Sequence, residues 1–208
     1  MLVTKLQYFL LAALSCAIIN PAISADLKDP GDSYIFYKAG ITNFEGDVET
    51  SYGSTHRTLS YDQGLGLNAG YGWITKGSVR AEAELFHRRA DVTTESGSSS
   101  AGQLELNGIL ISGYSNGESP FYLGLGMGIG MASLTLNART PSLSADNEPF
   151  LAFKISAGWD KSITESVDLF VEAEFLGTSQ IDMNGSNGYD YFLNHGETSI
   201  FIGARQWF

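Results

Sequence analysis

The sequence predicts an all-β protein, an eight-stranded antiparallel up-and-down β-barrel that spans a membrane. Apolar residues recur at every second position from Ser33 onward, which is the period of a β-strand. Glycine makes up 24 of the 208 residues, well above an average of about 7 %, and it collects on the face opposite the apolar one. Short connections also alternate with long polar ones, as in transmembrane barrels with turns at one end and loops at the other.

Composition excludes several other classes. Aromatic residues make up 12 % of the chain and hydrophobic residues 43 %, which is too much for a disordered protein. So many glycines exclude a coiled coil, because each one weakens a helix. The 12 basic residues against 23 acidic ones argue against a nucleic-acid partner, which requires clustered Lys and Arg.

The first 25 residues have the pattern of a secretory signal peptide. Lys5 precedes an apolar run over residues 8–19, and small residues up to Ala25 follow it. We expect cleavage after Ala25, with Ser24 as the alternative, and a single barrel domain over residues 26–208. Cys16, the only cysteine, lies inside the signal. The exported domain is therefore expected to form without disulfides, metal or cofactor.

Four alternating segments are expected in the N-terminal half, over residues 35–41, 64–73, 79–86 and 103–114. The second is the clearest, because its odd positions are apolar from Leu65 to Trp73 and its even positions are glycine except for Asn68. In the third, apolar residues alternate with Arg80, Glu82 and Glu84. The fourth is predicted with its leucines on the apolar face and Glu105 opposite them.

Four more segments are expected over residues 121–131, 153–160, 167–175 and 200–208. The first of these has glycine at four alternate positions from Gly124 to Gly130, which disfavours a helix and gives a strand one bare face. Long polar connections are expected around residues 44–62, 93–102, 137–148 and 178–196.

The glycine face is expected to point into the barrel, because bare glycines facing solvent lose entropy without gaining packing. Charged residues on the same face are then expected to pair inside a lumen too narrow for a water-filled pore. The predicted lumen charge network comprises Lys38, Arg80, Glu82, Glu84, Arg88, Glu105, Lys154, Asp160, Asp168, Glu172, Glu174 and Arg205. The alternative is a soluble, lipocalin-like carrier with its apolar face inward.

Aromatic residues at the strand ends next to the short turns predict an interfacial belt. They are assigned to the outward face and to one end of the barrel, and they are Trp73, Tyr114, Phe121, Trp159 and Phe208.

Two segments resemble the small outer-membrane β-barrel family of OmpA-, OmpX- and Opa-type proteins. They are Pro120–Gly128, with its alternating glycines, and Ile202–Phe208, with Gly203 and a terminal Phe208. The resemblance implies a monomer in the outer membrane of a Gram-negative cell, in contact with outer-membrane lipids and lipopolysaccharide. It also implies that Gly203 and Phe208 belong to a signal read by the barrel-assembly machinery. Gln206 departs from the family pattern, since that position is usually apolar.

The expected function is structural or surface-interaction, by adhesion or recognition through the extracellular loops. The candidate loop contacts are Tyr189, Tyr191 and Phe192. No enzymatic activity is expected. Three alternatives remain open: a lipid A acyltransferase or deacylase using His87 or His195, a narrow porin-like channel, and the soluble carrier.

Overall fold

The computed structural model describes residues 29–208, except 47, 53–54, 76–78, 95–99, 116, 118, 137–142, 185–189 and 194. The predicted signal peptide thus lies outside the described residues. The strands in the described part are β1 (Ser33–Glu45), β2 (Val48–Tyr52), β3 (Thr55–Tyr61), β4 (Gln63–Ile74), β5 (Val79–Thr94), β6 (Ser100–Ser115), β7 (Phe121–Leu136), β8 (Leu143–Thr164), β9 (Val167–Thr178), β10 (Ile181–Asn184), β11 (Asp190–Leu193) and β12 (Gly196–Trp207).

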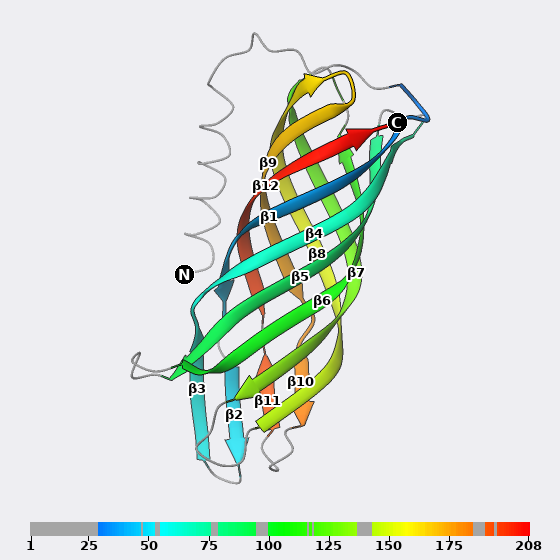
Figure 1. Cartoon of the computed structure of the whole chain (residues 1–208). Helices are drawn as coiled ribbons and strands as arrows, with labels where there is room; N and C mark the ends of the chain where they lie inside the picture. Colours follow the sequence, from blue (N-terminus) through cyan, green and yellow to red (C-terminus); the bar gives the residue numbers. More distant parts are fainter. Residues whose placement is uncertain are drawn as a thin grey trace.

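Eight of these strands form a closed antiparallel barrel (Figure 1). In order around the wall they are β1, β4, β5, β6, β7, β8, β9 and β12. The barrel closes where β12 pairs with β1, from Tyr34 opposite Trp207 to Glu45 opposite Gly196. The predicted eight-stranded barrel is confirmed. The described residues contain no helix with the length and apolar character needed to cross a bilayer.

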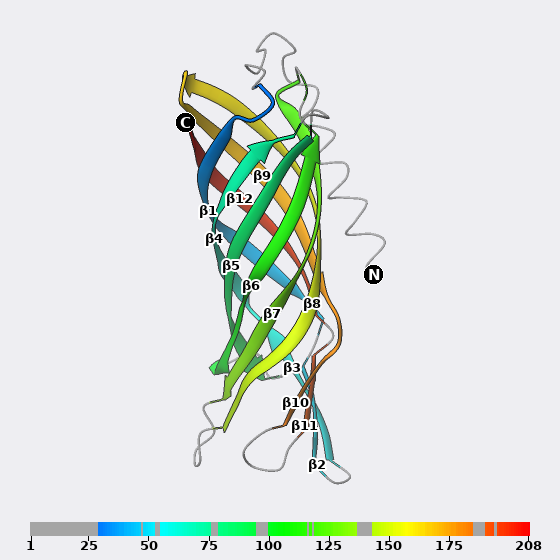
Figure 2. The same cartoon turned by 90° about the vertical axis from the view of Figure 1, so that its right-hand side faces the viewer.

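The other four strands extend the barrel at the end away from the short turns (Figure 2). β2 pairs with β3, β10 pairs with β11, and β11 joins the two hairpins by pairing with β2. β3 continues onto the wall, where Tyr61 lies opposite Val92 of β5. We refer to β2, β3, β10 and β11 as the extension. The long polar connections expected around residues 44–62 and 178–196 thus contain four short strands, which form because the segments pair with one another.

The apolar face points outward, as predicted. The side chains of Leu67, Leu125 and Ile155 are 56 %, 67 % and 48 % exposed on the outside of the barrel, whereas Lys38 and Glu84 are buried inside it. So much contiguous exposed apolar surface is unlike that of a soluble monomer. This outward apolar surface argues against the alternative of a soluble, lipocalin-like carrier, because such a carrier needs these residues inside the barrel.

β6 is the exception, because its alternation was predicted with the wrong face inward. Leu104, Leu106 and Leu110 are fully buried inside the barrel, and Glu105 lies on the outward face. The reason is that the loop-end half of the lumen is filled by apolar side chains rather than charged ones.

Glycines on the inward face make room for aromatic rings on neighbouring strands. A Cβ at Gly72 would lie 2.1 Å from the Tyr34 ring, and one at Gly158 would lie 2.2 Å from the Tyr122 ring. These contacts let large rings lie flat against the wall of a narrow barrel.

The interior therefore has three layers along the axis. Aromatic and apolar side chains, among them Tyr34, Phe170 and Trp207, fill the short-turn end. Charged side chains fill the middle. A larger apolar core, which includes Leu134, Phe150 and Tyr191, fills the loop end beneath the extension.

Candidate functional site: the charged lumen

Lys38 on β1 forms the centre of the middle layer. Its Nζ lies 2.6 Å from Oε1 of Glu172, 2.7 Å from Oε2 of Glu174 and 3.1 Å from Oε1 of Glu84. All four side chains are almost completely buried. Because the three carboxylates come from β9 and β5, one ammonium group joins three strands across the lumen.

Two more cations complete this layer. Lys154 of β8 pairs with Glu84 and donates to the Tyr114 hydroxyl at 2.8 Å. Arg88 of β5 pairs with Glu174 at 2.6 Å and with Glu197 at 2.5 Å. Asn68 of β4 accepts from Arg88 and donates to Glu84. The network is therefore continuous from β8 to β12.

A second cluster lies toward the short turns. Nη1 of Arg80 lies 3.4 Å from Oδ2 of Asp160, and Nη1 of Arg205 lies 2.9 Å from the same oxygen. The Arg80 guanidinium stacks over Tyr114 and Tyr122. Since guanidinium groups stack well on aromatic faces, these rings help to hold two like charges close together.

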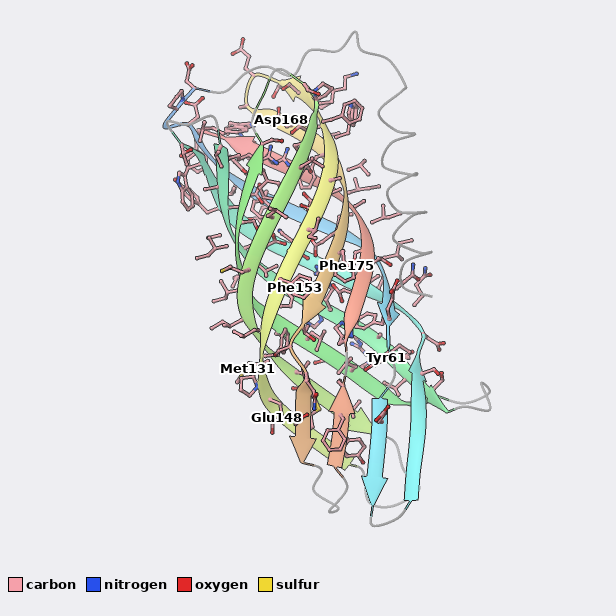
Figure 3. All side chains as sticks on the ribbon, turned by 180° about the vertical axis from the view of Figure 1, so that it is seen from behind. Tyr61, Met131, Glu148, Phe153, Asp168 and Phe175 are labelled. Carbon is pink, nitrogen blue, oxygen red and sulfur yellow. The ribbon has the colours of Figure 1, made fainter. Side chains whose placement is uncertain are left out.

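Two aromatic donors anchor carboxylates in the same region. The Tyr34 hydroxyl donates to Glu82 at 2.5 Å, and the Trp207 indole N–H donates to Asp168 at 2.6 Å. Figure 3 shows Asp168 near the short-turn end, far from Tyr61 at the loop end. Aromatic side chains therefore bind two of the buried carboxylates on the short-turn side of the lumen.

Chemically, this arrangement suits cross-linking better than catalysis. Buried charges are tolerated only when opposite charges and hydrogen bonds compensate them, and each of Lys38, Lys154 and Arg88 has such partners. Among the described residues, no group of three or more His, Cys, Asp or Glu side chains has an arrangement that could hold a metal ion.

Of the twelve residues predicted for the network, eleven face the lumen and Glu105 does not. Glu105 was misplaced because the β6 face was inverted. Glu197 and Asn68 were not in the predicted set, although both are buried in the network. Their inward positions follow from the strand period, since Glu197 lies two residues before the buried Ser199 and Asn68 lies in the glycine row.

The predicted aromatic belt also changes, because the inward face of β6 was predicted wrongly. Trp73 and Phe208 are 38 % and 69 % exposed on the outward face near the short turns. Phe121 and Trp159 face each other across β7 and β8 on the same face. Tyr114 does not belong to the belt, because it is 2 % exposed and lies in the lumen against Lys154.

Gly203 of the predicted assembly signal is a close-packing position. A Cβ at Gly203 would lie 2.3 Å from the Phe170 ring. The terminal Phe208 stays on the wall because its backbone N–H donates to Ser33.

The three candidate loop contacts have different outcomes in the structure. Tyr189 lies outside the described residues. Tyr191 was wrongly predicted as a surface contact, because β11 directs it into the apolar core, where it is 3 % exposed. Phe192, the next residue, points outward and is 37 % exposed.

Comparison with solved structures identifies the architecture. The solid-state NMR structure of the outer membrane protein AlkL in DMPC bilayers has a TM-score of 0.57 at 14 % identity, covering 91 % of this chain and 97 % of that one. OprG from Pseudomonas aeruginosa has a TM-score of 0.55 at 13 % identity, covering 86 % and 99 %. The fold is that of small outer-membrane barrels.

Ail, the attachment invasion locus protein of Yersinia pestis, has the same architecture, with a TM-score of 0.51 at 13 % identity over 86 % of this chain and 100 % of that one. No protein-family profile matches the sequence, and no curated protein matches it. At these identities the likeness to small outer-membrane barrels describes the fold and assigns no role to any residue.

Proposed function

We propose that this chain is an integral outer-membrane protein of the OmpA, OmpX and Opa type that acts at the cell surface by adhesion or recognition. In this proposal the signal peptide exports the chain, the short turns face the periplasm and the extension faces outward. The outward apolar band supports insertion in a bilayer, because a closed barrel leaves no unpaired strand edge in the membrane-spanning wall. Lipopolysaccharide and the other outer-membrane lipids are the partners of this band.

The observation that supports the proposal is the set of buried ion pairs inside the barrel. Ion pairs centred on Lys38, Arg88 and Lys154 occupy the middle of the barrel. The larger apolar core lies next to them on the loop-end side. A charged solute crossing the barrel would have to break several buried ion pairs. The lumen therefore serves as a support for the extension rather than as an ion path.

The extension offers the surface for contact. Phe192 points outward from β11 between its cross-strand neighbours Asp182 of β10 and Glu49 of β2, which are both exposed. An aromatic ring with acidic neighbours suits a partner that presents cationic groups beside an apolar patch.

A lipid A enzyme that uses His195 and Ser199 is not favoured by the positions of these two side chains. His195 is buried beside Glu197, between the rings of Phe44 and Tyr61. Ser199 shares a hydrogen bond with Thr42 inside the barrel. Neither side chain faces the membrane, where such an enzyme meets its substrate.

Two measurements on the whole protein test the proposal. Outer-membrane fractionation with a heat-modifiability gel is expected to show a folded, boiling-sensitive form in the outer membrane. The purified protein is expected to give no discrete conductance steps in a planar bilayer. Recovery in the periplasmic fraction, or regular unitary steps, would contradict the proposal.

Surface recognition is tested with Phe192→Ala. We expect this variant to fold normally and to reduce adhesion of expressing cells to protein-coated surfaces by about tenfold, as for loss of one aromatic contact residue. Asp91→Asn, an outward substitution on the barrel wall, is the matched control. Equal adhesion of wild type, both variants and cells without the protein would reject a recognition role.

One observation favours a second candidate, the sideways passage of apolar molecules. In the described part, β8 pairs with β9 only from Ala152 onward, and the stretch of β8 from Glu148 to Leu151 borders Ser179 and β10 without forming a strand ladder with them. This stretch also borders the apolar core through Phe150. Faster uptake of the apolar dye N-phenylnaphthylamine by expressing cells would support this candidate, and unchanged uptake would dismiss it.

A further inference from the structure

A groove of about 1200 Å³ crosses the outward face of the barrel. It runs along the hydrogen-bonding direction, between two rows of outward side chains on neighbouring strands. One row contains Ala39, Leu67, His87 and Asn107, which are successive cross-strand partners on β1, β4, β5 and β6. The other row contains Tyr37, Ala69, Leu85 and Ile109.

The groove has one hydrogen-bonded polar pair among its mostly apolar outward side chains. Nδ1 of His87 lies 2.6 Å from Oδ1 of Asn107. Because a carboxamide oxygen only accepts, the ring donates through Nδ1–H in this hydrogen bond, and in the tautomer that carries only this proton Nε2 is an acceptor. The Asn107 amide group keeps its N–H donors. The pair therefore offers one acceptor and at least one donor side by side on the outside of the barrel.

This pair stands at the boundary of the outward apolar band. Toward the short turns its neighbours are Leu85 and Ile109, which are 60 % and 50 % exposed. Toward the loop end the outward positions become polar, with Arg89 opposite Glu105. A lipid group that meets His87 and Asn107 therefore lies where acyl chains join their headgroups.

The part of the groove on the short-turn side of the pair has the length of one acyl chain. From Asn107 on β6 to Ile202 on β12 this part crosses four strand spacings, or about 19 Å. Strands in such barrels tilt by about 40°, so this path descends about 12 Å, which is one leaflet of an apolar band about 25 Å tall. Ala69 and Ala39 leave space along the path, which ends at Tyr37 and Ile202. Beyond Asn107 the lining continues over β7 and β8 to Ser179.

The charges near the pair do not favour a phosphate. Arg89 faces Glu105 across the strands, and the next outward pair is Asp91 with Gln103, joined by a hydrogen bond of 3.3 Å. Two carboxylates beside one guanidinium leave no excess positive charge. The group recognised by His87 and Asn107 is therefore uncharged, with both a donor and an acceptor.

We propose that this groove binds one acyl chain of an outer-leaflet glycolipid, whose amide or 3-hydroxyl group hydrogen-bonds with His87 and Asn107. The chemical class is an amide-linked hydroxyacyl saccharolipid, the chemistry of lipid A, rather than a plain glycerophospholipid. The proposal rests on the outer-membrane placement proposed above, and it specifies which lipid group the wall selects.

The test measures lipid retention on the purified, folded protein by native mass spectrometry from detergent micelles. Lipid A and phosphatidylglycerol are added at equal concentration. Wild type is expected to retain lipid A in preference to phosphatidylglycerol. The double variant His87→Leu/Asn107→Leu is expected to lose about tenfold in lipid A retention with phosphatidylglycerol unchanged, since two hydrogen bonds are removed.

Two further variants make the result specific. Asp91→Leu/Gln103→Leu removes a similar polar pair from the same two strands outside the groove, and it is expected to retain lipid A as wild type does. Ala69→Phe fills the groove and is expected to reduce lipid A retention with the polar pair intact. Equal retention of both lipids by wild type, or equal losses in both double variants, would overturn the proposal. Because the assay uses micelles, its outcome is independent of where fractionation places the protein.

Discussion

A single ammonium group in the middle of the lumen compensates three carboxylates. Lys38 contacts Glu84, Glu172 and Glu174 within 3.1 Å. Glu84 also pairs with Lys154, and Glu174 also pairs with Arg88. Buried ion pairs add little net stability compared with apolar packing, but removal of one partner leaves uncompensated charge. Lys38 is therefore the residue whose loss is expected to destabilise the barrel most.

We expect Lys38→Met to lower the free energy of unfolding by about 3–5 kcal/mol, measured by urea titration in lipid vesicles. Adding Glu172→Gln to this variant is expected to restore part of the loss, because one buried negative charge is removed. Lys161→Met, on the outward side, is the control and is expected to change stability by less than about 0.5 kcal/mol. If Lys38→Met and Lys161→Met have equal effects, the network does not stabilise the fold.

At the scale of elements, the strand period predicted the alternation on every barrel strand but not always which face is inward. For β4 and β7 the glycine rows identified the inward face. β6 has no such row, and its apolar residues occur on both faces, with Leu104 and Leu106 inside and Ile109 and Ile111 outside. Because the lumen changes from charged to apolar along its axis, hydrophobicity alone cannot determine the face of this strand.

The same limit explains the errors in the predicted site. Glu105 and Tyr114 were both placed from the β6 phase and are both wrong for one reason. The position of Tyr191 depended on β11, a strand that forms only by pairing with β2 and β10 from distant parts of the chain. Sequence patterns within one segment do not contain that information.

Glycine positions covered by rings give a prediction about strand packing. We expect Gly158→Ala to lower the free energy of unfolding by about 1–3 kcal/mol, because the new methyl group would lie 2.2 Å from the Tyr122 ring. Gly113→Ala is the matched control on the outward face, where the nearest atom would lie 3.7 Å away. Thermal unfolding in detergent compares the two, and equal shifts in Tm would refute close packing at Gly158.

At the scale of the whole molecule, the hairpin of β10 and β11 is connected to the barrel but takes no part in the pairings of its wall. None of the eight wall pairings involves β10 or β11, and Thr178 already contacts His195 through a backbone hydrogen bond of 3.1 Å. A two-residue turn therefore has the geometry to replace what lies between them.

Replacing residues 179–194 by Asn-Gly is expected to leave a folded, heat-modifiable barrel with a lower Tm. The loss of stability follows from uncovering part of the apolar core that Ile181, Met183 and Tyr191 cover. Gel mobility with and without boiling, followed by thermal unfolding, measures both effects. A variant that migrates only as the unfolded form would show that the β10–β11 hairpin is required for the barrel to close.

The stretch of β8 from Glu148 to Leu151, which has no strand ladder with β9, also affects association between molecules. The N–H and C=O of Leu151 point toward β9 and β10, where they bond with Ser179. Two residues earlier on the strand, Pro149 faces the same side and has no N–H to donate. A strand from a neighbouring molecule would lack one backbone hydrogen bond at Pro149. The absence of this bond disfavours edge-to-edge pairing of molecules into fibres.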